Sequence, residues 1–145
     1  MKKLIYTLLA LALTAVLGAQ TGLFNLSFDI EADEAIEILE ASGFEIIDET
    51  SDRIRFSDSE NPYVDEIWLY FAGDDSLESW TIFYLPQDDE DIEDLVMDAL
   101  IERHGTDFAV DFIYEEFYWD LDEFHSVSAS WWGDALFNVE YRHNY

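Results

Sequence analysis

Residues 66–85, EIWLYFAGDDSLESWTIFYL, hold the strongest strand signal of the chain. Two runs rich in aromatic residues, 67–72 and 80–85, flank the turn-forming segment 73–76. Runs of this kind, bounded by glycine, aspartate and serine, are typical of β-hairpins. We therefore expect two antiparallel strands here.

The rest of the chain holds further short runs of the same character. By the same criteria, we expect strands over residues 24–30, 44–47, 53–57, 112–120, 124–132 and 135–142. Gly133 and Asp134 separate the last two runs, and a two-residue turn with glycine first suits a type II′ hairpin. Most of the chain is therefore expected to form antiparallel sheet.

Two segments follow a helical period instead. Apolar residues recur at i, i+3, i+4 and i+7 in 32–39 and again in 92–100. A glycine follows each segment, Gly43 and Gly105, as is common just beyond a helix C-terminus. Asp88 or Asp89 is the expected N-cap of the second helix.

Each predicted helix precedes a polar strand and a closing hairpin rich in aromatic residues. We therefore expect an α+β fold built from two similar helix-plus-antiparallel-meander halves, 23–85 and 88–145, packed as one domain over 20–145. A helix laid across one face of each meander would bury the apolar sides of both elements.

This pattern resembles a known group of small exported bacterial proteins. The pieces that carry the resemblance are EAIEILEASGF at 34–44 and LIERHG at 100–105, with later strands that end near Trp131 and Tyr141. Tandem helix-glycine-strand-hairpin units are similar to the β-lactamase inhibitor protein (BLIP-like) fold and to SmpA/OmlA-type modules. The resemblance implies a binding or scaffolding role without chemistry, and it assigns no functional residue.

The first nineteen residues have the pattern of a secretory signal peptide. Lys2 and Lys3 precede the apolar run 4–17, and the small residues Gly18 and Ala19 follow it. The apolar run is shorter than the roughly 20 residues of a membrane span, and Gln20 stands where a lipoprotein signal would need cysteine. We expect cleavage after residue 19 and export to the periplasm or beyond, with no stable membrane anchor.

The remainder of the chain is strongly acidic. The whole sequence has a formal net charge of −28, and only four arginines would face all 34 acidic residues once the leader is removed. Such a field repels nucleic acid and would attract cations or a basic protein partner. Adaptation to a saline habitat explains the same acidity. A calcium-responsive role is a further alternative, although the acidic run 88–94 lacks the EF-hand order of glycine and glutamate.

Signals for catalysis are weak, and we predict no catalytic residue, no metal and no cofactor. The chain has no cysteine and no Gly-x-Ser-x-Gly elbow. His104 fits a cation at a helix C-terminus. His125 and His143 could approach each other on the final hairpin, as a metal pair or as ordinary strand residues. A hydrolase that uses paired carboxylates remains an alternative, because 34 acids leave any pair unassigned.

The predicted strands carry aromatic residues on both of their faces, which is more than one buried face needs. In alternating strands, Trp68 and Tyr70 face away from Ile67 and Leu69. A sheet covered by helices on one side needs apolar residues on that side alone. We therefore predict a non-enzymatic binding module whose second sheet face carries Trp68, Tyr70, Trp119 and Trp132. The alternative is that loops cover this face. The oligomeric state and the partner are left open.

Overall fold

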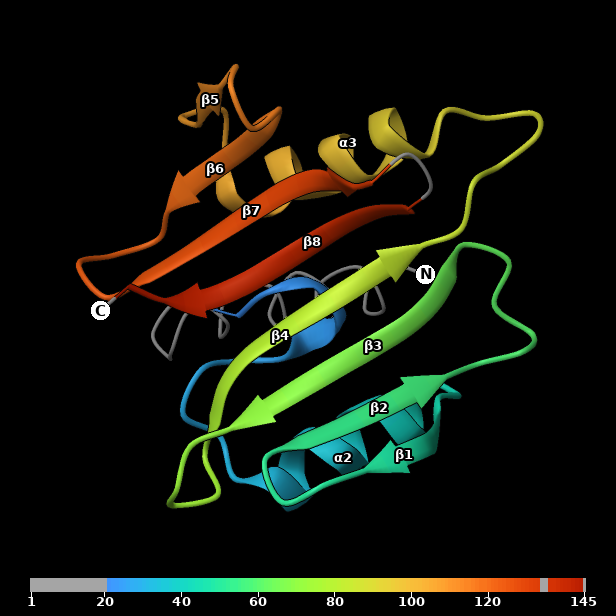
Figure 1. The fold of residues 1–145 in the computed structure, drawn as a ribbon, viewed down its shortest axis with the longest axis vertical. Coiled ribbons are helices and arrows are strands. Elements are labelled where there is room, and N and C mark those ends of the chain that lie inside the picture. Colours follow the sequence, from blue (N-terminus) through green and yellow to red (C-terminus); the bar gives the residue numbers. More distant parts are fainter. Residues whose placement is uncertain (1–20, 134–135, 145) are drawn as a thin grey trace, which may run out of the picture.

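The protein is one antiparallel sheet with two helices, as the computed structural model shows for residues 21–133 and 136–144 (Figure 1). The expected α+β class is therefore confirmed. The predicted leader 1–19 and Asp134 of the predicted turn lie outside the described residues.

Eight strands form the sheet, and every neighbouring pair is antiparallel. They are β1 (Glu45–Glu49), β2 (Arg53–Ser57), β3 (Val64–Phe71), β4 (Leu77–Tyr84), β5 (Ala109–Asp111), β6 (Glu116–Asp120), β7 (His125–Trp132) and β8 (Leu136–His143). Their order across the sheet is β1-β2-β3-β4-β8-β7-β6-β5. The first and last expected hairpins thus meet at the centre, where β4 pairs with β8.

Both helices lie against the same face of the sheet (Figure 1). Helix α2 (Ala32–Ala41) buries Ala35 and Leu39 and is followed by Gly43 at a φ of 97°. A positive φ of this size favours glycine, because residues with a side chain rarely adopt it. The predicted first helix is therefore confirmed.

Helix α3 (Ile92–His104) begins later than expected. Asp91 is its N-cap, and the Asp91 carboxylate accepts a hydrogen bond of 3.0 Å from the Glu93 N–H. The prediction of Asp88 or Asp89 as N-cap is wrong, since a run of acidic residues offers several equivalent caps in sequence. Gly105 ends the helix at a φ of 89°, as predicted.

The predicted strand over 24–30 is wrong. Leu23–Asn25 form a short 3-10 turn, η2, and Phe24 and Asn25 have φ values of 60°. Left-handed residues cannot continue an extended strand. Leu26 and Phe28 are buried, and the segment packs behind the sheet without forming one of its strands (Figure 1).

The predicted strand over 112–120 is interrupted. The Asp111 carboxylate accepts hydrogen bonds from the N–H groups of Ile113 and Tyr114, at 2.8 and 3.2 Å, and turns the chain between β5 and β6. Phe112 and Ile113 therefore lie at an exposed tip, with 87% and 84% of their surfaces accessible.

The core lies between the sheet and the two helices. At its centre, Trp80 of β4 stacks on Tyr141 of β8 with ring centroids 4.5 Å apart and planes 10° apart. The Leu23 N–H donates to the Tyr141 hydroxyl at 3.0 Å, so the segment before α2 is fastened to these rings. Among the described residues, no helix is both long and apolar enough for a membrane crossing.

Candidate functional site

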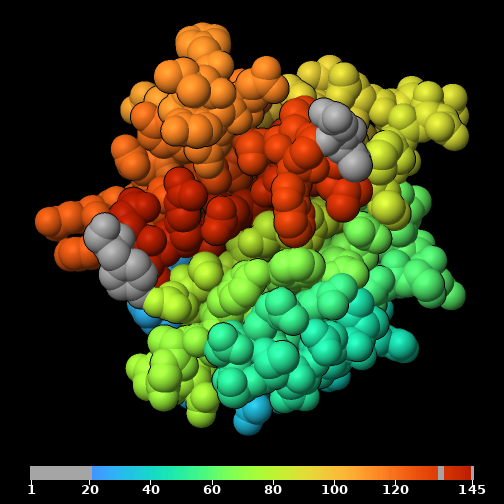
Figure 2. All heavy atoms as spheres, viewed as in Figure 1, coloured from blue at the N-terminus to red at the C-terminus, as the bar shows by residue number. Residues whose placement is uncertain are grey.

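The sheet face opposite the helices, here called the open face, is the candidate functional site (Figures 1 and 2). Ile67 and Leu69 of β3 are fully buried on the helix side. Trp68 and Tyr70 alternate with them and are half-buried on the open face. The predicted orientation of these two side chains is therefore observed.

Three aromatic rings from three strands contact one another on the open face. We call Trp68 of β3, Phe83 of β4 and Trp132 of β7 the aromatic cluster. The Trp68 and Phe83 centroids lie 4.9 Å apart, those of Phe83 and Trp132 lie 5.0 Å apart, and those of Trp68 and Trp132 lie 5.9 Å apart. Phe83 is 5% exposed and Trp132 is 56% exposed, so the cluster has a buried base and an accessible rim.

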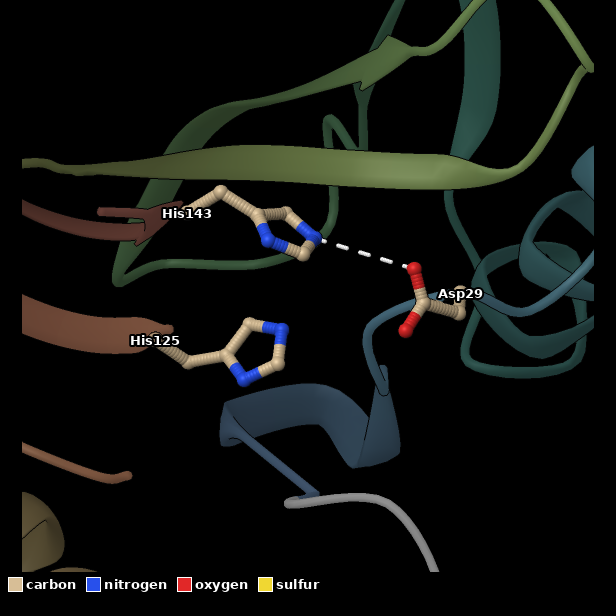
Figure 3. Close-up of side chains that lie close together, drawn as sticks. All are labelled: Asp29, His125 and His143. Carbon is tan, nitrogen blue, oxygen red and sulfur yellow. Dashed lines mark ion pairs between the residues drawn. The ribbon is translucent and has the colours of Figure 1, made fainter. Parts of the chain in front are cut away.

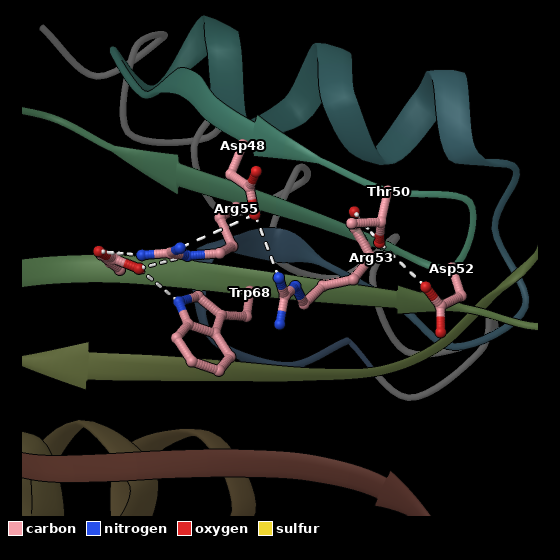
Figure 4. A network of polar contacts seen from close by, with 7 residues as sticks. Asp48, Thr50, Asp52, Arg53, Arg55 and Trp68 are labelled. Atoms are coloured by element: carbon pink, nitrogen blue, oxygen red, sulfur yellow. Dashed lines mark hydrogen bonds and ion pairs between the residues drawn. The ribbon is translucent and has the colours of Figure 1, made fainter.

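Two arginines of β2 flank the aromatic cluster (Figure 4). The guanidinium carbons of Arg53 and Arg55 lie 5.3 and 5.1 Å from the Trp68 ring centroid, within cation–π range. Both residues stand directly opposite open-face residues of β3: Arg53 pairs with Tyr70, and Arg55 pairs with Trp68. Residues directly opposite on neighbouring strands share a face.

Carboxylates hold these guanidinium groups in place. Arg55 donates two hydrogen bonds to Glu66, from Nε at 2.9 Å and from Nη2 at 2.7 Å. Glu66 also accepts the Trp68 indole N–H. Asp48 of β1 accepts a hydrogen bond of 3.1 Å from Arg53. The hydrogen bond to Glu66 is the main cause that raises the pKa of Arg55. The ring and both cations therefore form one ordered unit.

The open face also carries most of the arginines of the chain. Arg142 of β8 lies opposite Ser126, 3.6 Å from Glu140 and 3.8 Å from Glu116. With Arg53 and Arg55, it brings three of the four arginines of the chain to this face. Tryptophan, tyrosine and arginine are the residue types that dominate protein interfaces.

Trp119 is not part of this surface, so its assignment to the aromatic face is wrong. Trp119 of β6 stands opposite Val127, which stands opposite Tyr141, and all three are buried on the helix side. The Trp119 indole N–H donates to the Gly105 carbonyl at 2.9 Å. Alternation shows that Trp119 and Tyr118 face opposite sides, but the side covered by helices depends on tertiary packing.

Sequence reasoning also missed residues of the site. Phe83, Arg53 and Arg55 were not assigned to it, although each lies on a predicted strand. What the three residues share is their position in the strand pairing, because the register places all of them on the same sheet face as Trp68. That register cannot be read from the alternation of one strand alone.

His104 differs from the charged residue that its position predicts. Its Nε2 lies 2.8 Å from the Tyr141 hydroxyl, beneath the sheet. Burial, with a smaller contribution from the charge of Arg103, lowers the pKa of His104 to about 4. His104 is therefore neutral at pH 7 and cannot stabilise the helix C-terminus as a cation.

A separate apolar hollow of about 350 Å³ lies beside α3. Its described lining is Leu23, Phe24, Tyr63, Tyr84, Ile92, Leu95, Val96 and Ala99. No carboxylate is among these lining residues. The described lining of the hollow is therefore predominantly apolar.

Comparisons with known proteins identify no relative. No protein-family model matches the chain, and neither the curated proteins nor the solved structures yield a significant match.

Proposed function

We propose that the protein is an exported, non-enzymatic binding module that recognises a partner protein through the open face. The single observation that carries this proposal is the aromatic cluster. Trp132 is 56% exposed, yet it is packed on Phe83 and Trp68. An accessible tryptophan on a buried aromatic base has the character of an interface hot spot.

Preorganisation supports the same proposal. Glu66 holds both Arg55 and the Trp68 indole, and Asp48 holds Arg53. Side chains that are already ordered lose little conformational entropy on binding. The open face therefore offers a partner a rigid set of rings, beside guanidinium groups whose charge is already matched by carboxylates.

Charge suggests the chemistry of the partner. The arginines of the open face are paired with carboxylates, and the chain as a whole has a net charge of −28. A complementary partner would present an apolar centre to the aromatic cluster and a basic rim to the surrounding carboxylates.

We also propose that the sheet is made of two similar halves, as in the BLIP-like pattern. Helix α2 precedes β1–β4 and α3 precedes β5–β8. The strand order places β4 and β8 at the centre and β1 and β5 at the two edges, which supports this proposal. Trp132 of one half then meets Trp68 and Phe83 of the other.

A cross-linking experiment tests the binding proposal. The wild-type protein and a Trp68→Ser/Trp132→Ser variant are used as baits in the exported fraction of the source cells. The matched control is Phe112→Ser/Ile113→Ser, which removes two exposed apolar side chains from the β5–β6 tip. We expect one partner to be recovered with wild type and control and to be lost with the open-face variant. Equal recovery with all three baits would refute the proposal.

A further inference from the structure

Three potential metal ligands from distant parts of the chain lie together at one end of β7 and β8 (Figure 3). They are Asp29, before α2, His125 at the start of β7 and His143 at the end of β8. One ligand atom from each lies within 4.8 Å of the other two. The His125 and His143 centroids are 4.3 Å apart, and His143 Nε2 lies 3.7 Å from Asp29 Oδ1.

The hydrogen bonding of His125 suits a metal ligand. Its Nδ1 lies 2.8 Å from both carboxylate oxygens of Asp122. With the Nδ1–H donated to the Asp122 carboxylate, the lone pair of the ring lies on Nε2. A carboxylate bonded to the other ring nitrogen is the usual support of a metal-binding histidine.

The Nε2 atom of His125 is buried and has no hydrogen-bond partner among the described residues. Buried polar atoms without a partner are rare, and each calls for an explanation such as a bound ion. Figure 3 shows this nitrogen on the side of the ring that faces Asp29. One nitrogen of His143 also lies on the side of its ring that faces Asp29. The Nε2 atom of His125 is thus available to an ion held between these residues.

The surroundings hold the two imidazoles firmly and leave the carboxylate free to adjust. The buried Phe28 ring packs against His125 at 4.2 Å and against His143 at 5.3 Å between centroids. The side chains of His125 and His143 are 14% and 19% exposed, whereas that of Asp29 is 69% exposed. The Asp29 backbone is anchored by a 3.0 Å hydrogen bond to the Leu77 carbonyl.

We propose that Asp29, His125 and His143 bind a divalent transition-metal ion of the zinc type. Two imidazoles and one carboxylate are a ligand set that Zn²⁺ uses, with bonds of about 2.0–2.2 Å. Tetrahedral ligands at that distance stand roughly 3.3 Å apart, so the exposed Asp29 carboxylate must move inward. Three protein ligands leave a fourth tetrahedral position, which water or another donor group would fill.

Such an ion would cross-link the segment before α2 to the final hairpin, β7 and β8. Asp29 is distant in sequence from both histidines, and an ion that binds only the folded chain stabilises it by mass action. The site is separate from the open face, so its test does not depend on the binding proposal.

The test is zinc titration of the wild-type protein by calorimetry and thermal melting, with excess CaCl₂ present to occupy weak carboxylate sites. We expect one Zn²⁺ per chain and a rise in melting temperature. His125→Asn/His143→Asn should abolish both effects. Asp122→Asn, a positioning variant, should weaken zinc binding roughly 10–100-fold. His104→Gln is the matched histidine control and should bind zinc as the wild type does.

The Asp29→Asn variant provides a second test in case the double-histidine variant fails to fold. Asn tolerates the left-handed backbone of residue 29, where φ is 63°, so the apo melting temperature should be unchanged while zinc affinity falls. Co²⁺ gives an independent readout, because four-coordinate Co²⁺ absorbs visible light strongly. Zinc binding of wild-type affinity in both the double-histidine and Asp29→Asn variants, or no zinc binding by wild type, would overturn the proposal.

Discussion

The indole of Trp132 on β7 meets the indole of Trp68 on β3 nearly edge-on, at 87° and 5.9 Å between centroids. Two strands, β4 and β8, lie between them in the sheet. The contact spans the centre of the sheet, where its first four and last four strands join. The most accessible ring of the aromatic cluster is therefore supported by both parts of the chain.

Removing a tryptophan should lower the free energy of unfolding by different amounts on the two faces of the sheet. Trp119→Ala should lower the free energy of unfolding by about 3–5 kcal/mol, because it leaves a cavity in the core at a residue only 2% exposed. Trp132→Ala removes two aromatic contacts at a residue 56% exposed and should cost about 1–2 kcal/mol. Urea denaturation measures both. Equal costs would contradict the assignment of these residues to opposite faces.

Gly22 is predicted to reject any side chain. A Cβ atom there would lie 2.6 Å from both the Trp80 and the Tyr141 rings, which are stacked in the core. Gly22→Ala should therefore destabilise the fold by about 1–3 kcal/mol through overpacking. Gly73→Ala is the control, because nothing lies within 4 Å of its Cβ position. Thermal melts in which the two variants match would show that the segment before α2 does not pack on these rings.

Because of the lowered pKa of His104, the protein should lose stability as the pH falls. The pKa of His104 is about 4 in the folded chain and has its ordinary value of 6.5 in the unfolded chain, so below pH 6.5 the unfolded chain takes up a proton that the folded chain does not. The free energy of unfolding should thus fall as the pH drops from 6.5 to 4. After allowance for partial exposure, the expected contribution is about 1–2 kcal/mol.

The matched variant for this prediction is His104→Gln, which cannot titrate. The many carboxylates protonate in both proteins, so the difference between the two pH profiles isolates the histidine. Urea unfolding at several pH values should give a shallower acid decline for His104→Gln. Superimposable profiles would mean that His104 titrates normally.

Salt should stabilise this protein. Like charges at a net charge of −28 repel one another in the compact state, and the screening length falls from about 10 Å at 0.1 M to about 3 Å at 1 M salt. The melting temperature should therefore climb between low and molar NaCl. A variant with glutamine at the exposed α2 positions Glu34, Glu37 and Glu40 should show a smaller rise. A flat wild-type profile would show that the carboxylates are already well dispersed.

Most of the secondary structure could be predicted from local pattern. The hairpin of β3 and β4, the strand β2, both helices and their closing glycines follow from alternation, helical period and turn residues. The two strand errors have different causes, one in tertiary packing and one in a local turn. Leu26 and Phe28 pack behind the sheet, and the Asp111 carboxylate breaks a run that reads as one strand.

The candidate site was predicted only in part. Trp68, Tyr70 and Trp132 lie on the open face, whereas Trp119 lies in the core and Phe83, Arg53 and Arg55 were missed. Alternation along one strand separates its two faces but does not say which face the helices cover. That choice depends on pairing register and packing across several strands.

The amino-acid order alone determined the local elements of this protein and its anionic character, because both depend on residue type and near neighbours. Tertiary structure alone decided which rings share a surface and that Asp29, His125 and His143 converge. Those proximities join residues far apart in the chain. They arise only when β4 pairs with β8 and the segment before α2 packs behind the sheet.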